Sequence, residues 1–197
     1  WFKSEFEDKE IGLVKVSRGK EHKFLGMNFV FNKEKGVNIE MKSYVKDMIN
    51  VCPEKITKKS VTPATMNFFK VRDDCKKLDS KLASIFHTIV VKGLFLCKRA
   101  RPDILTTIAF LTTWVKEPDE DDLKKMIRLI QYLNGTINLT TTFNADNLKI
   151  LKWYVDVSHQ VHPDYRSHTG SVLQLGNGSI YNKSSKQKIN TRSSTES

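Results

Sequence analysis

Apolar and polar residues alternate between residues 21 and 41, a period of two that predicts a β-hairpin. The polar segment 32–36 ends in Gly36 and predicts the turn of this hairpin. A short helix is expected next, with Ser43 as its cap. Its apolar residues share one helical face: Tyr44, Val45, Met48 and Ile49. The polar and basic residues 53–78 predict a surface connector.

From residue 80 the apolar spacing changes to the helical period, and three helices are predicted. Ser80 is placed to cap the first helix, and Pro102 and Pro118 suit the first turns of the other two. Gly135 is placed for the C-terminal cap of the third. Apolar residues recur at helical spacing through all three helices, which predicts a shared core.

After Gly135 the period returns to two, and strands are expected over residues 139–143, 148–157, 170–175 and 179–181. Turns are expected at 144–147 and at Gly176-Asn177-Gly178. The predicted fold class is α+β: an N-terminal β-hairpin, a three-helix bundle and then a mixed β-sheet. The change of period places the boundary between a helical module and a β-rich module near residue 137.

The 197 residues carry a net charge of +11, which favours a polyanionic partner such as nucleic acid over a merely soluble basic surface. Three widely spaced cysteines argue against a disulfide framework and fit a reducing compartment. No signal peptide and no uninterrupted apolar run of membrane-spanning length is present, so no membrane partner is expected. The chain starts at Trp1 without a methionine, and both ends are expected to be cuts in a longer polypeptide.

Two carboxylates are candidates for metal chemistry. Asp156 ends a strand that is expected to be buried, where a carboxylate is costly unless it is paired, protonated or metal-bound. Glu196 falls in the first turn of a helix that Ser193 or Ser194 would cap. Mg²⁺ prefers such oxygen ligands. The plainer alternatives are an Asp156 that accepts from loop amides and a Glu196 that belongs to a capping box.

Basic residues gather after Asp164 and predict a track for phosphate groups, with a solvated basic face as the alternative. They are Arg166, His168, Lys183, Lys186, Lys188 and Arg192. The histidines at 159, 162 and 168 fit no structural zinc spacing and are expected to line the loop after the first strand of this region. Arg101 either pairs locally with Asp103 or contacts a nucleic-acid backbone.

Several short motifs occur in a fixed order along the chain. They are Phe24-Leu25-Gly26-Met27, Arg101-Pro102-Asp103-Ile104, Tyr132-Leu133-Asn134-Gly135-Thr136, Trp153-Tyr154-Val155-Asp156, His168-Thr169-Gly170, Lys183-Ser184-Ser185-Lys186-Gln187 and Ser193-Ser194-Thr195-Glu196. In this order the chain resembles the reverse transcriptase and ribonuclease H region of copia-type retrotransposon polyproteins. The resemblance implies the end of the polymerase palm (1–66), the thumb (67–137) and the first part of ribonuclease H (138–197).

The resemblance also implies roles for particular residues. Asp156 and Glu196 would be catalytic ligands of Mg²⁺, and the turn Phe24, Leu25, Gly26 and Met27 would position the end of the primer. The partners would be an RNA–DNA hybrid or template–primer duplex and the remainder of the polyprotein. The location would be intracellular, in cytoplasm, nucleus or virus-like particles.

The parent protein would copy RNA into DNA and degrade the RNA of the hybrid. The Tyr-Val-Asp-Asp motif of the polymerase and the later ribonuclease H carboxylates are not in this sequence, so the fragment is expected to be inactive alone. Two other interpretations remain open: a non-catalytic, basic nucleic-acid-binding module from a decayed or repurposed element, and a helical interaction protein.

Overall fold

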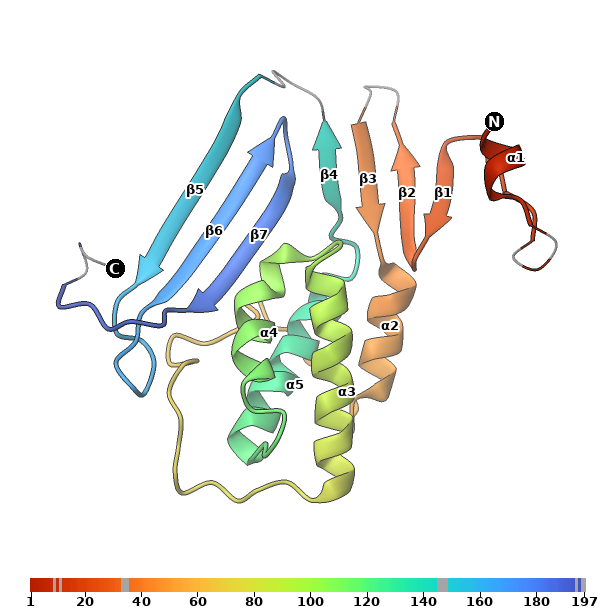
Figure 1. The fold of residues 1–197 in the computed structure, drawn as a ribbon. Coiled ribbons are helices and arrows are strands. Elements are labelled where there is room, and N and C mark those ends of the chain that lie inside the picture. The colour runs from red at the N-terminus through yellow and green to blue at the C-terminus, as the bar shows by residue number, and fades with distance from the viewer. Residues whose placement is uncertain (9, 11, 33–35, 145–148, 194, 196–197) are drawn as a thin grey trace.

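The computed structural model describes residues 1–8, 10, 12–32, 36–144, 149–193 and 195. Over these residues the predicted α+β class is confirmed. The helices form one group, and two antiparallel sheets lie next to it (Figure 1). Residues 33–35 of the predicted turn 32–36 lie outside the described residues, as do residues 145–147 of the predicted turn 144–147, Ser194 and Glu196. A short N-terminal helix, α1 (Phe2–Phe6), was not expected and lies at one end of the molecule in Figure 1.

The first sheet has the order β1-β2-β3-β4. Its strands are β1 (Glu21–Phe24), β2 (Met27–Phe31), β3 (Gly36–Glu40) and β4 (Thr141–Asn144). The first three come from the predicted hairpin region, which therefore contains one strand and one turn more than expected. β4 was expected to begin the C-terminal sheet, but it pairs with β3, with Val37 opposite Phe143. This pairing satisfies the backbone groups that β3 would otherwise present as an open edge.

The second sheet is an antiparallel meander of order β5-β6-β7. Its strands are β5 (Leu151–Ser158), β6 (His168–Leu175) and β7 (Ser179–Lys186). The predicted turn between β6 and β7 is confirmed, with positive φ at Gly176 and Gly178. A Cβ at Gly178 would lie 2.6 Å from the carbonyl oxygen of Thr142, so this glycine also allows the two sheets to approach. The backbones of Asn144 and Asn177 exchange hydrogen bonds of 3.0 and 2.9 Å there.

The helices are α2 (Lys42–Val51), α3 (Ser80–Cys97), the 3₁₀ turn η1 (Pro102–Ile104), α4 (Leu105–Thr112) and α5 (Glu120–Gly135). The predicted apolar stripes form one core, in which the side chains of Phe86, Ile108 and Leu133 are fully buried. The connector over residues 53–78 forms neither a helix nor a strand, as expected, although its Phe68 is buried in this core.

The helix caps differ from those predicted. Asp79, rather than Ser80, caps α3 by accepting from the backbone N–H of Leu82 at 2.8 Å. Asp119 caps α5 in a capping box with Asp122. A carboxylate is a stronger acceptor for the unpaired N–H groups of a first turn than a hydroxyl, and the helix dipole favours its charge. No side-chain cap closes α2, so the expected role of Ser43 was wrong.

Among the described residues, α3 is long and apolar enough to cross a membrane by length and composition. One such helix is weak evidence, because the core helices of globular domains pass the same test. α3 packs against α2, α4 and α5, and its residues Phe86, Ile89 and Val90 are fully buried there.

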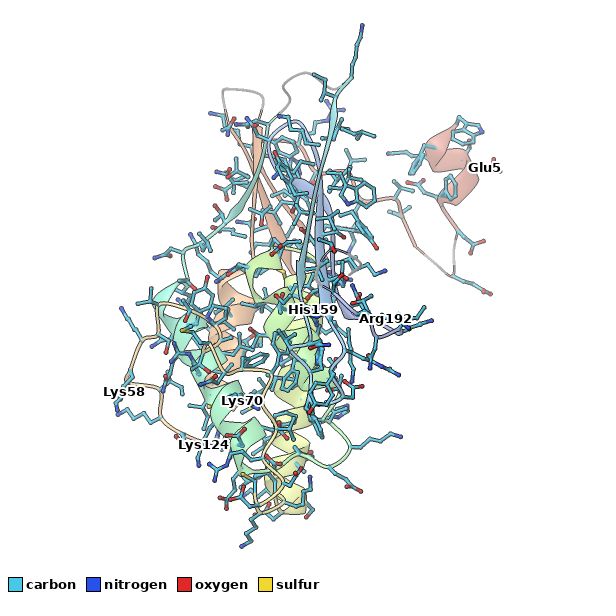
Figure 2. The ribbon with its side chains drawn as sticks, turned by 90° about the vertical axis from the view of Figure 1, so that its left-hand side faces the viewer. Glu5, Lys58, Lys70, Lys124, His159 and Arg192 are labelled. Atoms are coloured by element: carbon cyan, nitrogen blue, oxygen red, sulfur yellow. The ribbon has the colours of Figure 1, made fainter. Side chains whose placement is uncertain are left out.

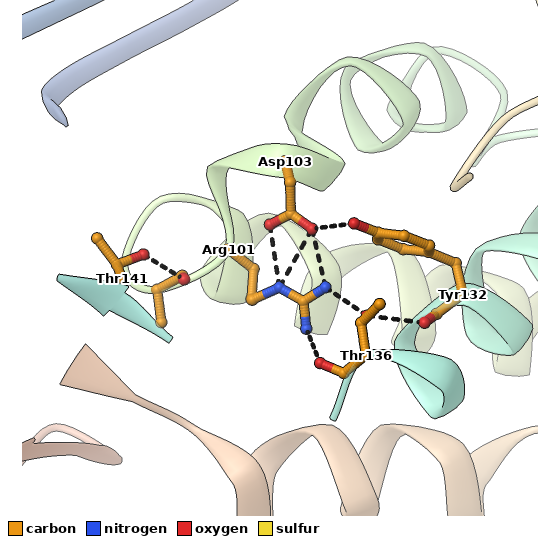
Figure 3. Close-up of polar contacts among 6 residues, drawn as sticks. Arg101, Asp103, Tyr132, Thr136 and Thr141 are labelled. Atoms are coloured by element: carbon orange, nitrogen blue, oxygen red, sulfur yellow. Dashed lines mark hydrogen bonds and ion pairs between the residues drawn. The ribbon is translucent and has the colours of Figure 1, made fainter. Parts of the chain in front are cut away.

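A buried guanidinium joins the ends of several elements (Figure 3). Arg101 is only 2% exposed, and its Nε and Nη2 donate to the carboxylate of Asp103 at 2.8–3.2 Å. Nη1 donates to the Thr136 carbonyl at 3.0 Å, and the hydroxyl of Tyr132 donates to Asp103 at 2.8 Å. Next to this group, Thr141 of β4 donates to the carbonyl of Ala100 at 2.7 Å. We call this group the Arg101 clamp.

Replacement of Arg101 by Met should lower the free energy of unfolding by about 3 kcal/mol, because it leaves Asp103 and Thr136 without their partner. The matched control is Arg72→Met, since Arg72 pairs with Asp74 at the same sequence spacing but on the exposed surface. Urea denaturation of the two variants compares the costs. Equal destabilisation by both substitutions would contradict the structural role of the clamp.

Candidate functional site

Asp156 lies on β5, opposite Gly170 of β6, and it is exposed. The expectation of a buried strand was wrong: β5 is an edge strand of its sheet, and Trp153 and Val155 are 60% and 61% exposed. The carboxylate of Asp156 therefore pays no burial cost that a metal ion would have to offset. It helps to line a pocket of about 260 Å³ between the second sheet and the start of α4, which Lys183 and Ser184 also line.

The second predicted metal ligand, Glu196, lies outside the described residues. Within the described part of the chain, no group of three or more His, Cys, Asp or Glu residues is arranged to hold a metal ion. Mg²⁺ takes six oxygen ligands in nearly octahedral geometry. Asp156 alone does not provide such a site, so the described residues do not complete a magnesium centre.

Two of the three candidate histidines are buried together. The ring nitrogens of His162 and His168 lie 3.0 Å apart, and the other ring nitrogen of His168 lies 2.7 Å from the hydroxyl of Ser184. Ser184 in turn donates to Thr106 of α4 at 3.0 Å. The chain of contacts fastens the second sheet to the helices. His168 is 6% exposed, so the structure places it inside the protein and not on the predicted phosphate track.

Aromatic rings surround this histidine pair. Phe69 of the connector contacts both imidazoles, with ring centroids 4.8 and 5.1 Å away, and Phe110 of α4 stacks on His162. Burial lowers the pKa of His168 to about 4, because the charged ring would lose its hydration. Burial also lowers the pKa of His162, and the nearby Lys186 adds to the effect.

Stability should fall as the pH drops below 6.5, the pKa of an unfolded histidine. Between pH 6.5 and about 4 the unfolded chain binds a proton that the folded His168 excludes, so the slope approaches about 1.4 kcal/mol per pH unit. Above pH 6.5 this contribution is fully present. His168→Gln should flatten the dependence, whereas His87→Gln, at an exposed position of α3, should leave it unchanged. Urea denaturation at pH 5 and 7 measures the difference, and parallel curves for all three proteins would contradict it.

The remaining basic residues of the predicted track do come together. Lys183, Lys186, Lys188 and Arg192 line an open groove of about 1160 Å³ along β7 and the segment that follows it. We call this the C-terminal groove. Arg166 lies beside it, and both Arg166 and Lys186 pair with Asp164, at 3.4 and 2.6 Å. The ion pair with Lys186 holds the pKa of Asp164 below its usual value.

Arg101, the other predicted contact in the helical region, is occupied in the clamp. The local pairing with Asp103 that the sequence left open is the arrangement in the structure. Its burial leaves no guanidinium N–H on the surface for a nucleic-acid backbone.

The turn Phe24, Leu25, Gly26 and Met27 joins β1 to β2. Leu25 has a φ of 47° and Gly26 one of 76°, the left-handed pair that a two-residue hairpin turn requires. Only glycine adopts this conformation without strain, so the exposed Leu25 is held in an unfavourable backbone conformation. In Figure 1 the turn lies beside the start of α2, on the opposite side of the molecule from β5. The structure therefore does not bring the turn and the C-terminal groove together.

A second basic pocket was missed by the sequence analysis. It lies between the connector and α5, where Lys124, Lys125 and Arg128 line it. The spacing i, i+1, i+4 on the polar side of an amphipathic helix was the available signal. That signal did not show that the connector would fold back and close the other side of the pocket.

The known proteins to which this chain is similar come from transposons. The chain is 25% identical over 169 residues to a putative transposon Ty5-1 protein of Saccharomyces cerevisiae. The aligned region covers 86% of this chain and 54% of that protein. It is 35% identical over 97 residues to a retrovirus-related Pol polyprotein from transposon RE1 of Arabidopsis thaliana. Here the aligned region covers 49% of this chain and 7% of that protein. The chain thus spans about half of the first relative and a small part of the second. No protein-family model and no solved structure matches it. The similarities support the interpretation that the chain is part of a retrotransposon Pol-related polyprotein.

Proposed function

We propose that the chain is part of a copia-type reverse transcriptase and ribonuclease H, and that it binds RNA–DNA hybrid through the C-terminal groove. The observation that carries the proposal is the gathering of Lys183, Lys186, Lys188 and Arg192 in one groove of the sheet that bears Asp156. The order of the motifs and the similarity to two transposon proteins, one of them a retrovirus-related Pol polyprotein, support the same assignment.

The chemistry of the groove suits a phosphate backbone. Lys and Arg side chains that neutralise phosphates release condensed counterions, a sequence-independent contribution that falls with salt. Thr169, Gln187 and Asn190 also line the groove, and polar residues of this kind are suited to contacts with phosphate and sugar oxygens. Binding there would be independent of the base sequence.

Asp156 and Glu196 are the magnesium ligands that this chain would contribute. A bound Mg²⁺ ion would stabilise charge on a phosphodiester that is being cleaved. The further carboxylates would come from the rest of the polyprotein. Copying of RNA and cleavage of the hybrid are therefore proposed for the longer protein, and binding alone for this chain.

The chain should bind a fluorescent 20-base-pair RNA–DNA hybrid with an affinity that falls steeply between low and physiological salt. Lys183→Gln/Lys188→Gln should weaken binding and make the salt dependence shallower, because two phosphate contacts are lost. Lys46→Gln/Lys81→Gln, which removes two exposed charges on α2 and α3, is the matched control. Fluorescence anisotropy at several salt concentrations measures both effects, and a flat salt dependence of the unaltered chain would exclude the proposal.

The chain alone should neither cleave a hybrid nor extend a primer in Mg²⁺, since its metal site lacks ligands. In a protein extended by the remainder of the polyprotein, Asp156→Asn should abolish cleavage and leave hybrid binding intact. Gel electrophoresis of a labelled hybrid, with anisotropy in parallel, separates the two readouts. Cleavage that survives Asp156→Asn in the extended protein would show that this residue is not a metal ligand.

A further inference from the structure

The pocket between the connector and α5 gathers five cationic side chains outside the C-terminal groove. Its volume is about 330 Å³, and we call it the α5 pocket. The connector supplies Phe68, Lys70 and Arg72, and α5 supplies Lys124, Lys125, Arg128 and one carboxylate, that of Asp121. None of these residues was assigned to the binding surface proposed above.

Two of the five cations are neutralised by neighbouring carboxylates. Lys125 pairs with Asp121 at 2.9 Å, and Arg72 pairs with Asp74 at 3.2 Å. Lys70, Lys124 and Arg128 form no ion pair with any carboxylate of the described residues. The pocket therefore keeps three positive charges that the part of the chain described by the structure does not offset.

Arg128 also has a donor without an acceptor. Its Nη2 donates to the hydroxyl of Thr62 at 3.0 Å, but its Nε is shielded from solvent and has no hydrogen-bond partner among the described residues. A shielded guanidinium N–H without an acceptor is costly, and such groups in folded proteins call for an explanation. An anion bound next to this guanidinium would supply the opposite charge.

The walls of the pocket are fixed by the core. Lys125 donates to the carbonyl of Lys70 at 2.7 Å, which ties the connector to α5. Phe68 is buried, and its ring packs against Phe110 of α4 with centroids 4.8 Å apart. The cations of the pocket therefore stand on elements that are already held in place, so little ordering is needed when a ligand binds.

We propose that the α5 pocket binds a phosphate of a nucleic-acid backbone, as a second contact separate from the C-terminal groove. One phosphate presents several oxygens, so a guanidinium and two ammonium groups around a small pocket suit it better than a single carboxylate. Figure 2 shows the side of the molecule on which the connector and the C-terminal segment lie. In this view Lys70 and Lys124 lie below Arg192. This inference rests on the nucleic-acid binding proposed above and extends it to the helices.

The test compares three double variants of the chain by anisotropy with the same 20-base-pair RNA–DNA hybrid. Lys70→Gln/Lys124→Gln changes two exposed side chains of the pocket, and Arg128 is left intact because it also bonds Thr62. The other two are the groove pair Lys183→Gln/Lys188→Gln and the control pair Lys46→Gln/Lys81→Gln. Thermal unfolding verifies that each variant is folded.

The pocket pair should reduce the slope of log K against log salt by about 1, because the pocket is proposed to hold one phosphate, and the control pair should change it little. The losses from the pocket and groove pairs should add in a fourth variant that carries all four of these substitutions, because separate sites act independently. A pocket pair that behaves like the control, while the groove pair weakens binding, would overturn this inference and leave the proposed function standing. Absence of salt-dependent binding by the unaltered chain would overturn both.

Discussion

The buried guanidinium of Arg101 is the interaction on which the arrangement of this molecule depends. A charge that is 2% exposed is tolerated only when its donors are satisfied, and each of the three nitrogens of Arg101 donates a hydrogen bond. Its partners come from the turn after α3 and from the end of α5, which are separated by more than thirty residues. The carbonyl of Ala100, the residue before it, accepts from Thr141 at the start of β4. The clamp thus fixes where the chain leaves the helices and enters the first sheet.

The two sheets are then positioned by further polar contacts. β4 extends the first sheet, and the backbone pair of Asn144 and Asn177 joins that sheet to the second one. At the other end of the second sheet, the contacts from His162 through His168 and Ser184 to Thr106 fasten β6 and β7 to α4. Of these fastening groups, the side chains of Arg101, His162 and His168 are buried and paired. Lys183, Lys188, Lys70 and Lys124 are exposed on the outside, where the proposed phosphate contacts lie.

The sequence predicted elements well where burial alone decides them. Each helix has to bury an apolar stripe, and most of the positions expected in the core of α3, α4 and α5 are found there, although Leu94 of α3 is 40% exposed. Local chemistry was less decisive. Asp79 caps α3 in place of Ser80, and β7 continues to Lys186 through polar residues that carry no apolar alternation. Those residues form a strand because the backbone of β6 offers them partners, and no local pattern reports that.

The same distinction between local sequence and tertiary packing applies to the candidate site. The amino-acid sequence by itself determined the α+β class, the three core helices, the turn at 176–178 and the basic character of the C-terminal segment. These follow from periodicity, glycine conformation and charge, which are local properties. Tertiary structure alone decided that Arg101 and His168 are interior residues, that β5 is an exposed edge, that β4 joins the N-terminal strands and that the connector closes a pocket against α5. Each of these outcomes depends on which distant segment packs against a residue, because burial and pairing are properties of two surfaces and a single segment specifies one of them.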